Sequence, residues 1–370
     1  MSGGKIFIAA THQNVGKTLL SLGILGTLSR SGKNVGYIKP VGQRTIVAEG
    51  VEVDEDAVLM ERVFHIGSHL QDMNPVRVGK GFTADYIRHG RDSRLAEQIQ
   101  EAFDRVSQGR DFVVVEGTGH AGVGSVLDLS NARVAQLLGT PVVMVAPGGV
   151  GRPIDEVALN YVLLREAGVP LAGVVINKVK PHKYEQVKEL ATKGFAQKGI
   201  NVLGVLPFDD VLSAPSVKEV MIEVGGELIS QDVSEAALEA PVKHNLVGAM
   251  SAHQALDYFK PGSLIITPGD REDIILASIG MAISDEQSQP GMVSGIVLTG
   301  HTIPHPAILE LIHRARIPVI TCSKDTYTVA SQIHDLMVKI TPEESNKIEQ
   351  AIQLVGQYMD IQAICGQCLP

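Results

Sequence analysis

The chain has 370 residues, with 32 Lys and Arg against 41 Asp and Glu, so its formal net charge is −9. This length is enough for two or more domains with cores of their own. The acidic balance, without a basic tail or a run of like charges, argues against nucleic acid and against an anionic membrane surface as partners. No apolar stretch approaches the roughly 18 residues of a membrane-spanning helix, and no charged leader with a cleavage site opens the chain. We therefore expect a soluble, cytoplasmic protein that binds small molecules or other proteins.

The first half of the chain alternates short apolar runs with amphipathic stretches. Continuous apolar runs are typical of strands that are covered on both faces, as in a parallel sheet with right-handed crossovers. The expected strands are Ile6–Ala10, Val35–Ile38, Phe112–Val115, Val142–Val145, Val174–Ile176 and Val202–Leu206. The segments between them are expected to be helices. In the first helix, Gly23 and Gly26 are small enough to let it lie close against the sheet.

A second, smaller α/β domain is expected to follow. Ser213-Ala214-Pro215 is typical of a boundary, and apolar runs resume after it at Leu264–Thr267, Gly295–Thr299 and Pro318–Thr321. Ser230–Pro241 is polar and loop-like. The sequence thus predicts a larger α/β domain over 1–212, a second domain over 213–338, and a C-terminal helix and tail over 339–370.

The three cysteines are too few for a disulfide framework and fit a reducing compartment. Cys365-x-x-Cys368 has no second pair to complete a zinc tetrahedron, so we interpret these two residues as reduced thiols.

A phosphate-binding loop (P-loop) is predicted where the first strand gives way to the first helix, at Thr11-His12-Gln13-Asn14-Val15-Gly16-Lys17-Thr18. Backbone N–H groups of such a loop and of the helix N-terminus point at an anion, a lysine reaches the terminal phosphates, and a hydroxyl ligates Mg²⁺. These roles fall to Lys17 and Thr18. Thr11 occupies the place of the usual first glycine, but a strand before the loop and a helix after it are the expected context. The fold class is therefore a P-loop NTPase-type parallel sheet flanked by helices.

Two acidic positions are candidate partners of a nucleotide-bound metal. Glu116 ends a buried strand and is followed by glycines that permit close approach to a ligand, which is where doubly wound sheets bind; a capping role would explain the same residue. Asp56 lies in the loop-like stretch Asp54-Glu55-Asp56 and could add an oxygen ligand. An exposed acidic turn fits that stretch equally well.

Lys39 and Asn177 follow two other strands of the predicted sheet. The Lys39 ammonium would project toward the same crevice as Lys17 and neutralise charge there, although a solvated lysine before the turn-forming Pro40 fits the spacing equally. The Asn177 amide could read a purine edge.

Taken together, these motifs resemble the dethiobiotin synthetase superfamily over roughly Met1–Leu212. The matching strings are Thr11-x4-Gly16-Lys17-Thr18, Lys39-Pro40-Val41, Asp56-Ala57, Val114-Val115-Glu116-Gly117 and Ile176-Asn177-Lys178. The resemblance implies ATP and Mg²⁺ as cofactors and a homodimer. It also implies catalytic roles for Lys17, Lys39 and Glu116, and it places nucleotide contacts at the loop residues Thr11, Asn14, Val15, Gly16, Lys17 and Thr18, with Asn177 on the base. Metal ligation falls to Thr18, Asp56 and Glu116.

The second half is similar to a DRTGG domain over about Pro215–Leu336. The resemblance rests on Pro215–Glu219, Val247–Ser251, Pro261-Gly262, Ile266–Asp273 and Val297–Gly300. Asp270 can cap the helix that follows, which would leave Arg271 free to pair with an anion. With Thr299 after a neighbouring strand, these residues are the candidates for a second-domain ligand, and purely structural capping explains them equally well.

This order of domains resembles the N-terminal part of long-form phosphate acetyltransferase. We expect no acetyltransferase domain in the residues after Lys339, and Cys322 lacks the glycine-rich elbow of a glutaminase nucleophile. Two functions remain open. One is an ATP- and Mg²⁺-binding module that senses nucleotide, binds a second small molecule and biases a partner enzyme; slow ATP hydrolysis would accompany it. The other is an ATP-dependent ligase of dethiobiotin synthetase or cobyrinate amide synthetase type, which phosphorylates a carboxylate-like group.

Overall fold

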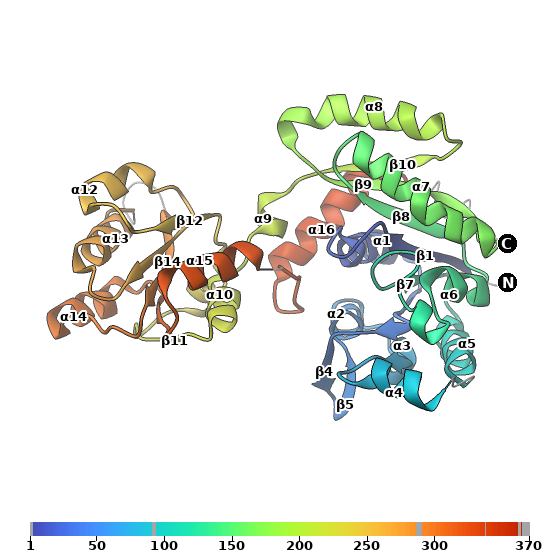
Figure 1. The fold of residues 1–370 in the computed structure, drawn as a ribbon, viewed down its shortest axis with the longest axis horizontal. Coiled ribbons are helices and arrows are strands. Elements are labelled where there is room, and N and C mark those ends of the chain that lie inside the picture. The colour runs from blue at the N-terminus through green and yellow to red at the C-terminus, as the bar shows by residue number, and fades with distance from the viewer. Residues whose placement is uncertain (1–2, 91–93, 286–290, 337, 362–363, 365–370) are drawn as a thin grey trace. The chain divides into compact units, whose positions relative to one another are not determined.

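The computed structural model describes residues 3–90, 94–285, 291–336, 338–361 and 364, and these form two compact units (Figure 1). The first unit comprises Met1–Asp209 together with Ile340–Pro370, and the second comprises Asp210–Lys339. The chain therefore leaves the first unit and returns to it. Cys365 and Cys368 lie outside the described residues, whereas Cys322 is buried.

A six-stranded sheet forms the centre of the first unit, in the order β10-β9-β8-β1-β7-β2, and every neighbouring pair is parallel. Its strands are β1 (Gly4–Ala10), β2 (Val35–Ile38), β7 (Phe112–Glu116), β8 (Val142–Pro147), β9 (Leu171–Val179) and β10 (Val202–Pro207). Each begins within three residues of the strand expected from the sequence. The predicted fold class, a parallel sheet flanked by helices, is confirmed.

Helices cover both faces of this sheet. They are α1 (Lys17–Arg30), α5 (Arg94–Ser107), α6 (Asn131–Leu138), α7 (Gly151–Glu166), α8 (Tyr184–Ala196) and α16 (Ser345–Tyr358). In Figure 1, α7 and α8 lie on one face, and α1 lies with α16 on the other. Within the described parts of the chain, no helix is long and apolar enough to cross a membrane.

The contact between α1 and α16 corrects the role expected for two glycines. A Cβ on Gly23 would lie 2.2 Å from Cβ of Val355, and a Cβ on Gly26 would lie 2.5 Å from Cγ1 of Ile352. The two glycines therefore face α16 rather than the sheet, and they let the last helix pack directly on the helix that follows the phosphate-binding loop. The C-terminal segment is thus an integral part of the first unit.

Between β2 and β7 the chain builds a small subdomain that the sequence did not predict in detail. It contains β3 (Val41–Gly42), β4 (Thr45–Ala48), β5 (Val51–Asp54), β6 (Val76–Arg77), α2 (Glu55–Phe64), α3 (Leu70–Met73) and α4 (Phe82–His89). The interpretation of Asp54-Glu55-Asp56 as a loop-like stretch is wrong. Asp54 is the N-cap of α2, its carboxylate accepts the Asp56 N–H, and Asp56 lies in the first turn.

The second unit has a five-stranded sheet in the order β11-β15-β14-β13-β12. Its strands are β11 (Glu227–Leu228), β12 (His244–Val247), β13 (Ser263–Pro268), β14 (Val293–Thr299) and β15 (Val319–Thr321), and only β11 is antiparallel to its neighbour. The helices are α9 (Asp210–Ser213), α10 (Val217–Val224), α11 (Glu235–Leu238), α12 (Ala252–Ala255), α13 (Glu272–Asp285), α14 (Pro306–Ala315) and α15 (Thr326–Asp335). The expected α/β unit is present, with the short helix α11 inside the segment that was expected to be a loop.

Short 3₁₀ helices complete both units. They are η1 (Ser125–Leu127) and η2 (Pro181–Lys183) in the first unit and η3 (Leu256–Tyr258) in the second.

Candidate functional site

The phosphate-binding loop joins the carboxyl end of β1 to the start of α1, as predicted. Its backbone is left-handed at Asn14 (φ 61°) and at Gly16 (φ 110°), and α1 begins at the next residue, Lys17. A Cβ on Gly16 would lie 2.2 Å from Nδ2 of Asn177. Glycine is therefore required at position 16 for two reasons: the positive φ disfavours other residues, and a Cβ would overlap the Asn177 side chain.

The end of β9 holds this loop in place. The buried Asn177 side chain donates from Nδ2 to the Val15 carbonyl oxygen at 2.7 Å, and the Lys178 ammonium donates to the Asn14 carbonyl oxygen at 3.0 Å. The Asn177 Oδ1 accepts the Lys178 N–H. Contact between Asn177 and a base stays a prediction, because in this structure the amide braces the loop. The same loop begins at Thr11, a buried residue whose N–H donates to the Val145 carbonyl oxygen.

Glu116, at the end of β7, accepts hydrogen bonds from three hydroxyl groups. Thr18 donates to Oε1 at 3.0 Å, while Ser21 and Tyr37 donate to Oε2 at 2.6 and 3.1 Å. The structure thus brings the loop hydroxyl and the strand-end carboxylate into direct contact, across 98 residues of sequence. Ser21 and Tyr37 are functional candidates that the sequence reasoning missed.

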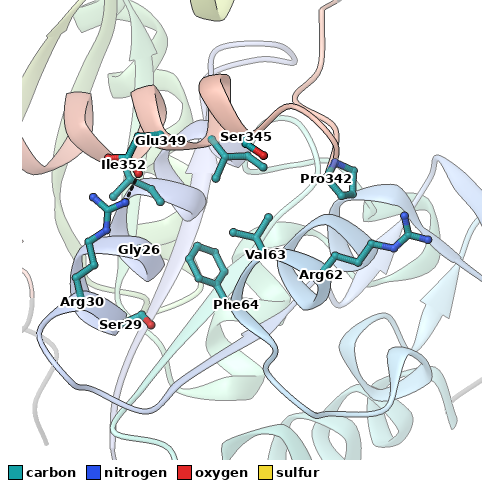
Figure 2. A pocket seen from close by; sticks show the side chains of 11 residues that line it. Gly26, Ser29, Arg30, Arg62, Val63, Phe64, Pro342, Ser345, Glu349 and Ile352 are labelled. Atoms are coloured by element: carbon teal, nitrogen blue, oxygen red, sulfur yellow. Dashed lines mark hydrogen bonds and ion pairs between the residues drawn. The ribbon is translucent and has the colours of Figure 1, made fainter. Parts of the chain in front are cut away.

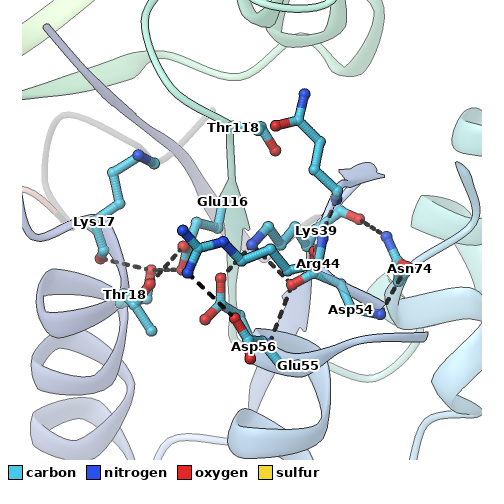
Figure 3. A network of polar contacts seen from close by, with 12 residues as sticks. Lys17, Thr18, Lys39, Arg44, Asp54, Glu55, Asp56, Asn74, Glu116 and Thr118 are labelled. Carbon is cyan, nitrogen blue, oxygen red and sulfur yellow. Dashed lines mark hydrogen bonds and ion pairs between the residues drawn. The ribbon is translucent and has the colours of Figure 1, made fainter. Parts of the chain in front are cut away.

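Lys39 joins the same region from the end of β2, and its ammonium is paired with two carboxylates. It donates to Asp54 Oδ1 at 2.8 Å and also contacts Asp56 Oδ2, and all three side chains are at most 8% exposed. Figure 3 shows Lys39 between these aspartates and Glu116. The buried network therefore holds three carboxylates around one ammonium. That Lys39 faces a reacting group stays a prediction.

Burial and neighbouring charges both shift the pKa values of the groups in this network. Burial raises the pKa of Glu116, the Asp56 carboxylate raises it further, and Lys39 lowers it. Burial alone would lower the pKa of Lys39, but Asp56, Glu116 and Asp54 together raise it above its usual value. Burial and the Glu116 charge raise the pKa of Tyr37 well above its usual value, so this hydroxyl keeps its proton and acts as a donor.

Asp54 and Asn74 organise the loop after Lys39, and neither role was expected from the sequence. Asp54 Oδ2 accepts the N–H groups of Gln43 and Arg44 at 3.0 and 3.3 Å. The buried Asn74 accepts the Asp54 N–H at 3.0 Å and donates to the Lys39 carbonyl oxygen at 2.8 Å. These contacts fix the backbone of the segment that follows Lys39.

The donor set fits a magnesium ion that is only partly held by protein. The Thr18 hydroxyl and Glu116 Oε1 adjoin one another, and Asp56 lies in the same buried network. Among the residues that the structure describes, no group of three or more His, Cys, Asp and Glu is placed to hold a metal. Mg²⁺ on a nucleotide usually takes one or two protein oxygens and fills its shell with phosphate oxygens and water. The residues present therefore suit that ion better than a metal held in an all-protein cage.

Two of the three candidates in the second unit, Arg271 and Thr299, already have partners. Arg271 donates to the carbonyl oxygens of Gly248 and Met250 at 2.9 and 2.6 Å and pairs with Asp273. Arg271 is therefore paired within the protein in this structure, and its pairing with an anion stays a prediction. Thr299 is buried with its hydroxyl 2.7 Å from that of Thr326, and Asp270 is exposed.

A cavity of about 410 Å³ lies between α1, α2 and α16 (Figure 2). Its lining on α1 begins at Gly26, so about 14 Å of helix, at 1.5 Å per residue from Lys17, separates it from the phosphate-binding loop. Both of its guanidinium groups are paired, Arg30 with Glu349 and Arg62 with Glu343. The pairing argues against a phosphate site in this cavity.

Comparison with known proteins agrees with the two resemblances found in the sequence. A family model described as an AAA domain matches residues 4–216, and one described as a DRTGG domain matches residues 219–336. The chain is 28% identical to phosphate acetyltransferase of Nitratidesulfovibrio vulgaris and 26% identical to that of Nitrosomonas europaea. These matches cover 96% and 98% of this chain but 50% and 51% of the relatives. The chain thus spans about half the length of the curated relatives it matches, in the order expected for their N-terminal part.

Among solved structures, the chain is 18% identical to the CBS and DRTGG domains of the regulatory region of Clostridium perfringens pyrophosphatase, complexed with diadenosine tetraphosphate. That match covers 49% of this chain and 85% of the other, with a TM-score of 0.28. A score at that level establishes no common function.

Proposed function

We propose that this chain, which belongs to the AAA domain family, binds ATP with Mg²⁺ at the loop between β1 and α1 and serves a regulatory role. The observation that carries the proposal is the contact of the Thr18 hydroxyl with Glu116 Oε1 at 3.0 Å, directly after the left-handed Gly16 and beside Lys17. Loop amides and Lys17 would hold the phosphates. Thr18, Glu116 and Asp56 would hold the metal, which supplies charge neutralisation at the phosphate oxygens.

Calorimetry with ATP, ADP and GTP, each with and without Mg²⁺, tests this proposal. We expect ATP to bind more tightly when Mg²⁺ is present, and we expect Lys17→Ala to abolish this Mg²⁺-dependent binding. The matched control is Lys33→Ala, because Lys33 is an exposed lysine beyond the other end of α1. Absence of binding by all three nucleotides at millimolar concentration would contradict the proposal.

For the second unit we propose a separate small ligand, a nucleotide, at the loops that carry Asp270, Arg271 and Thr299. The proposal is supported by their common position after the carboxyl ends of the adjacent parallel strands β13 and β14. Because the Arg271 guanidinium is paired, it would have to exchange a partner for the ligand. Titration of the Lys17→Ala chain with AMP, ADP and ATP isolates this site. Binding that is lost on Arg271→Gln supports it, and a chain that binds none of the three contradicts it.

The regulated partner that we propose first is an enzyme with phosphate acetyltransferase activity, because the relatives carry that name. Addition of the wild-type chain together with ATP should change the rate of such an enzyme. Addition of the Lys17→Ala variant together with ATP should leave that rate unchanged. An unchanged rate in both cases would remove this partner. A homodimer in the cytoplasm remains part of the proposal, and sedimentation with and without ATP would test the oligomeric state.

A ligase that phosphorylates a carboxylate-like group is the second candidate. It is favoured by Lys39, whose buried ammonium lies in the network that contains Glu116. Phosphate release should then rise when carboxylic or diamino compounds are added, and Lys39→Ala should abolish the increase. A slow rate that no such compound stimulates would favour the regulatory function.

A further inference from the structure

The two oxygens of Glu116 have different surroundings. Oε2 accepts two hydroxyl hydrogens, from Ser21 at 2.6 Å and from Tyr37 at 3.1 Å. Oε1 accepts one, from Thr18 at 3.0 Å. A carboxylate oxygen offers about two acceptor positions, so Oε2 is filled and Oε1 has one position left.

The two donors on Oε2 come from different elements, and neither has a competing acceptor of equal quality. The Ser21 hydroxyl, on α1, also lies 3.1 Å from the Lys17 carbonyl oxygen, but its single hydrogen goes to the shorter and charged contact. Tyr37 lies on β2 with its side chain fully buried. Their hydrogen bonds come from α1 on one side and from β2 on the other, so the carboxylate cannot turn Oε2 toward the loop without losing both.

We propose that Ser21 and Tyr37 are positioning residues that fix the Glu116 carboxylate so that Oε1, beside the Thr18 hydroxyl, is the oxygen presented to the metal of a bound nucleotide. This inference rests on the proposed binding of ATP with Mg²⁺. Neither residue touches the nucleotide in this account. Both act by setting the orientation of Glu116, as the outer partners of metal ligands generally do.

The test separates metal binding from nucleotide binding. ATP affinity is measured in the full chain without divalent metal and then across a Mg²⁺ titration, for the wild type, Tyr37→Phe and Ser21→Ala. Each variant should keep the metal-free affinity, and the Mg²⁺ concentration that gives half of the enhancement should rise by about tenfold or more. Mn²⁺ binding to the ATP complex, followed by electron paramagnetic resonance, should weaken in parallel.

Matched controls are Tyr184→Phe, which removes a hydroxyl that donates to the Val205 carbonyl oxygen, and Ser31→Ala at the other end of α1. Both should leave the Mg²⁺ dependence unchanged. A purely structural role would lower the melting temperature and the metal-free affinity together, and that result would overturn the inference, as would an unchanged Mg²⁺ dependence in both variants. If the wild type itself binds no ATP, the proposed function fails and this inference fails with it. If the wild type responds to Mg²⁺ and the variants respond equally, only the inference fails.

Discussion

At the scale of single residues, the site is governed by buried charge. Asp54, Asp56 and Glu116 lie within one network around the Lys39 ammonium, and all four residues are at most 6% exposed. An unpaired buried charge lowers the free energy of unfolding by far more than a buried ion pair raises it. The network therefore depends on the Lys39 ammonium, and a positive ion that reaches Glu116 and Asp56 would offset the remaining negative charge.

Removal of the ammonium should destabilise the chain strongly. Lys39→Met removes the buried ion pairs with Asp54 and Asp56, so we expect the free energy of unfolding of the first unit to fall by about 3–5 kcal/mol. Urea denaturation followed by circular dichroism measures this loss, and the exposed Lys33→Met is the control. A loss below about 1 kcal/mol, the range of a surface ion pair, would show that the pairing contributes little.

Removal of the Glu116 charge should have the opposite effect on the ligand-free chain. The pKa of Glu116 is raised by burial, so the folded chain holds this proton more tightly than the unfolded chain, and the cost of the charge grows as pH rises through the folded pKa. Glu116→Gln should therefore raise the free energy of unfolding at about pH 8 and change it less at about pH 5.

Glu116→Gln should also lose the additional stabilisation that Mg²⁺ gives to the ATP-bound chain. Urea denaturation at both pH values, with the exposed Glu49→Gln as control, measures the first effect, and melting with ATP and Mg²⁺ measures the second. A destabilisation at about pH 8, or an intact response to Mg²⁺, would count against the assigned role of Glu116.

At the scale of elements, the sequence predicts the six buried strands of the first sheet because each is a continuous apolar run. It does not predict β12, an edge strand whose residues His244 and Asn245 are exposed, or β11, which has two residues. It also misses the partner of Gly23 and Gly26, because α16 lies more than 300 residues further along the chain. A glycine in a helix indicates a close approach, but the pattern does not say by what.

The packing of α16 on α1 gives a prediction at this scale. Gly23→Ala places a Cβ 2.2 Å from Cβ of Val355, and such overpacking should cost about 1–3 kcal/mol of folding free energy. Thermal and urea unfolding measure the cost. The control is Gly151→Ala at the start of α7, because a Cβ there has no heavy atom within 4 Å. Equal stability of the two variants would contradict the packing described for α16.

At the scale of the whole molecule, the chain passes from the unit that carries the phosphate-binding loop to a second α/β unit. It then returns to the first unit through α16. The order of the two domains and the residues of the loop could be predicted from motifs, because each motif is local in sequence. The network around Glu116 could not, because its contacts join residues 15 to 98 positions apart, such as Lys39 with Asp54 and Thr18 with Glu116. The unexpected roles of Ser21, Tyr37 and Asn74 all depend on such distant contacts.

Hydrogen exchange of the full chain, with and without ATP and Mg²⁺, tests the central claim most directly, because it locates the binding site as well as detecting binding. The account predicts that ATP with Mg²⁺ slows exchange in the loop and first turns of α1, from Thr11 to Ser21, and at the end of β7 near Glu116. Lys17→Ala should remove this protection. Unchanged exchange from Thr11 to Ser21 at saturating ATP and Mg²⁺, or equal protection in Lys17→Ala, would contradict it.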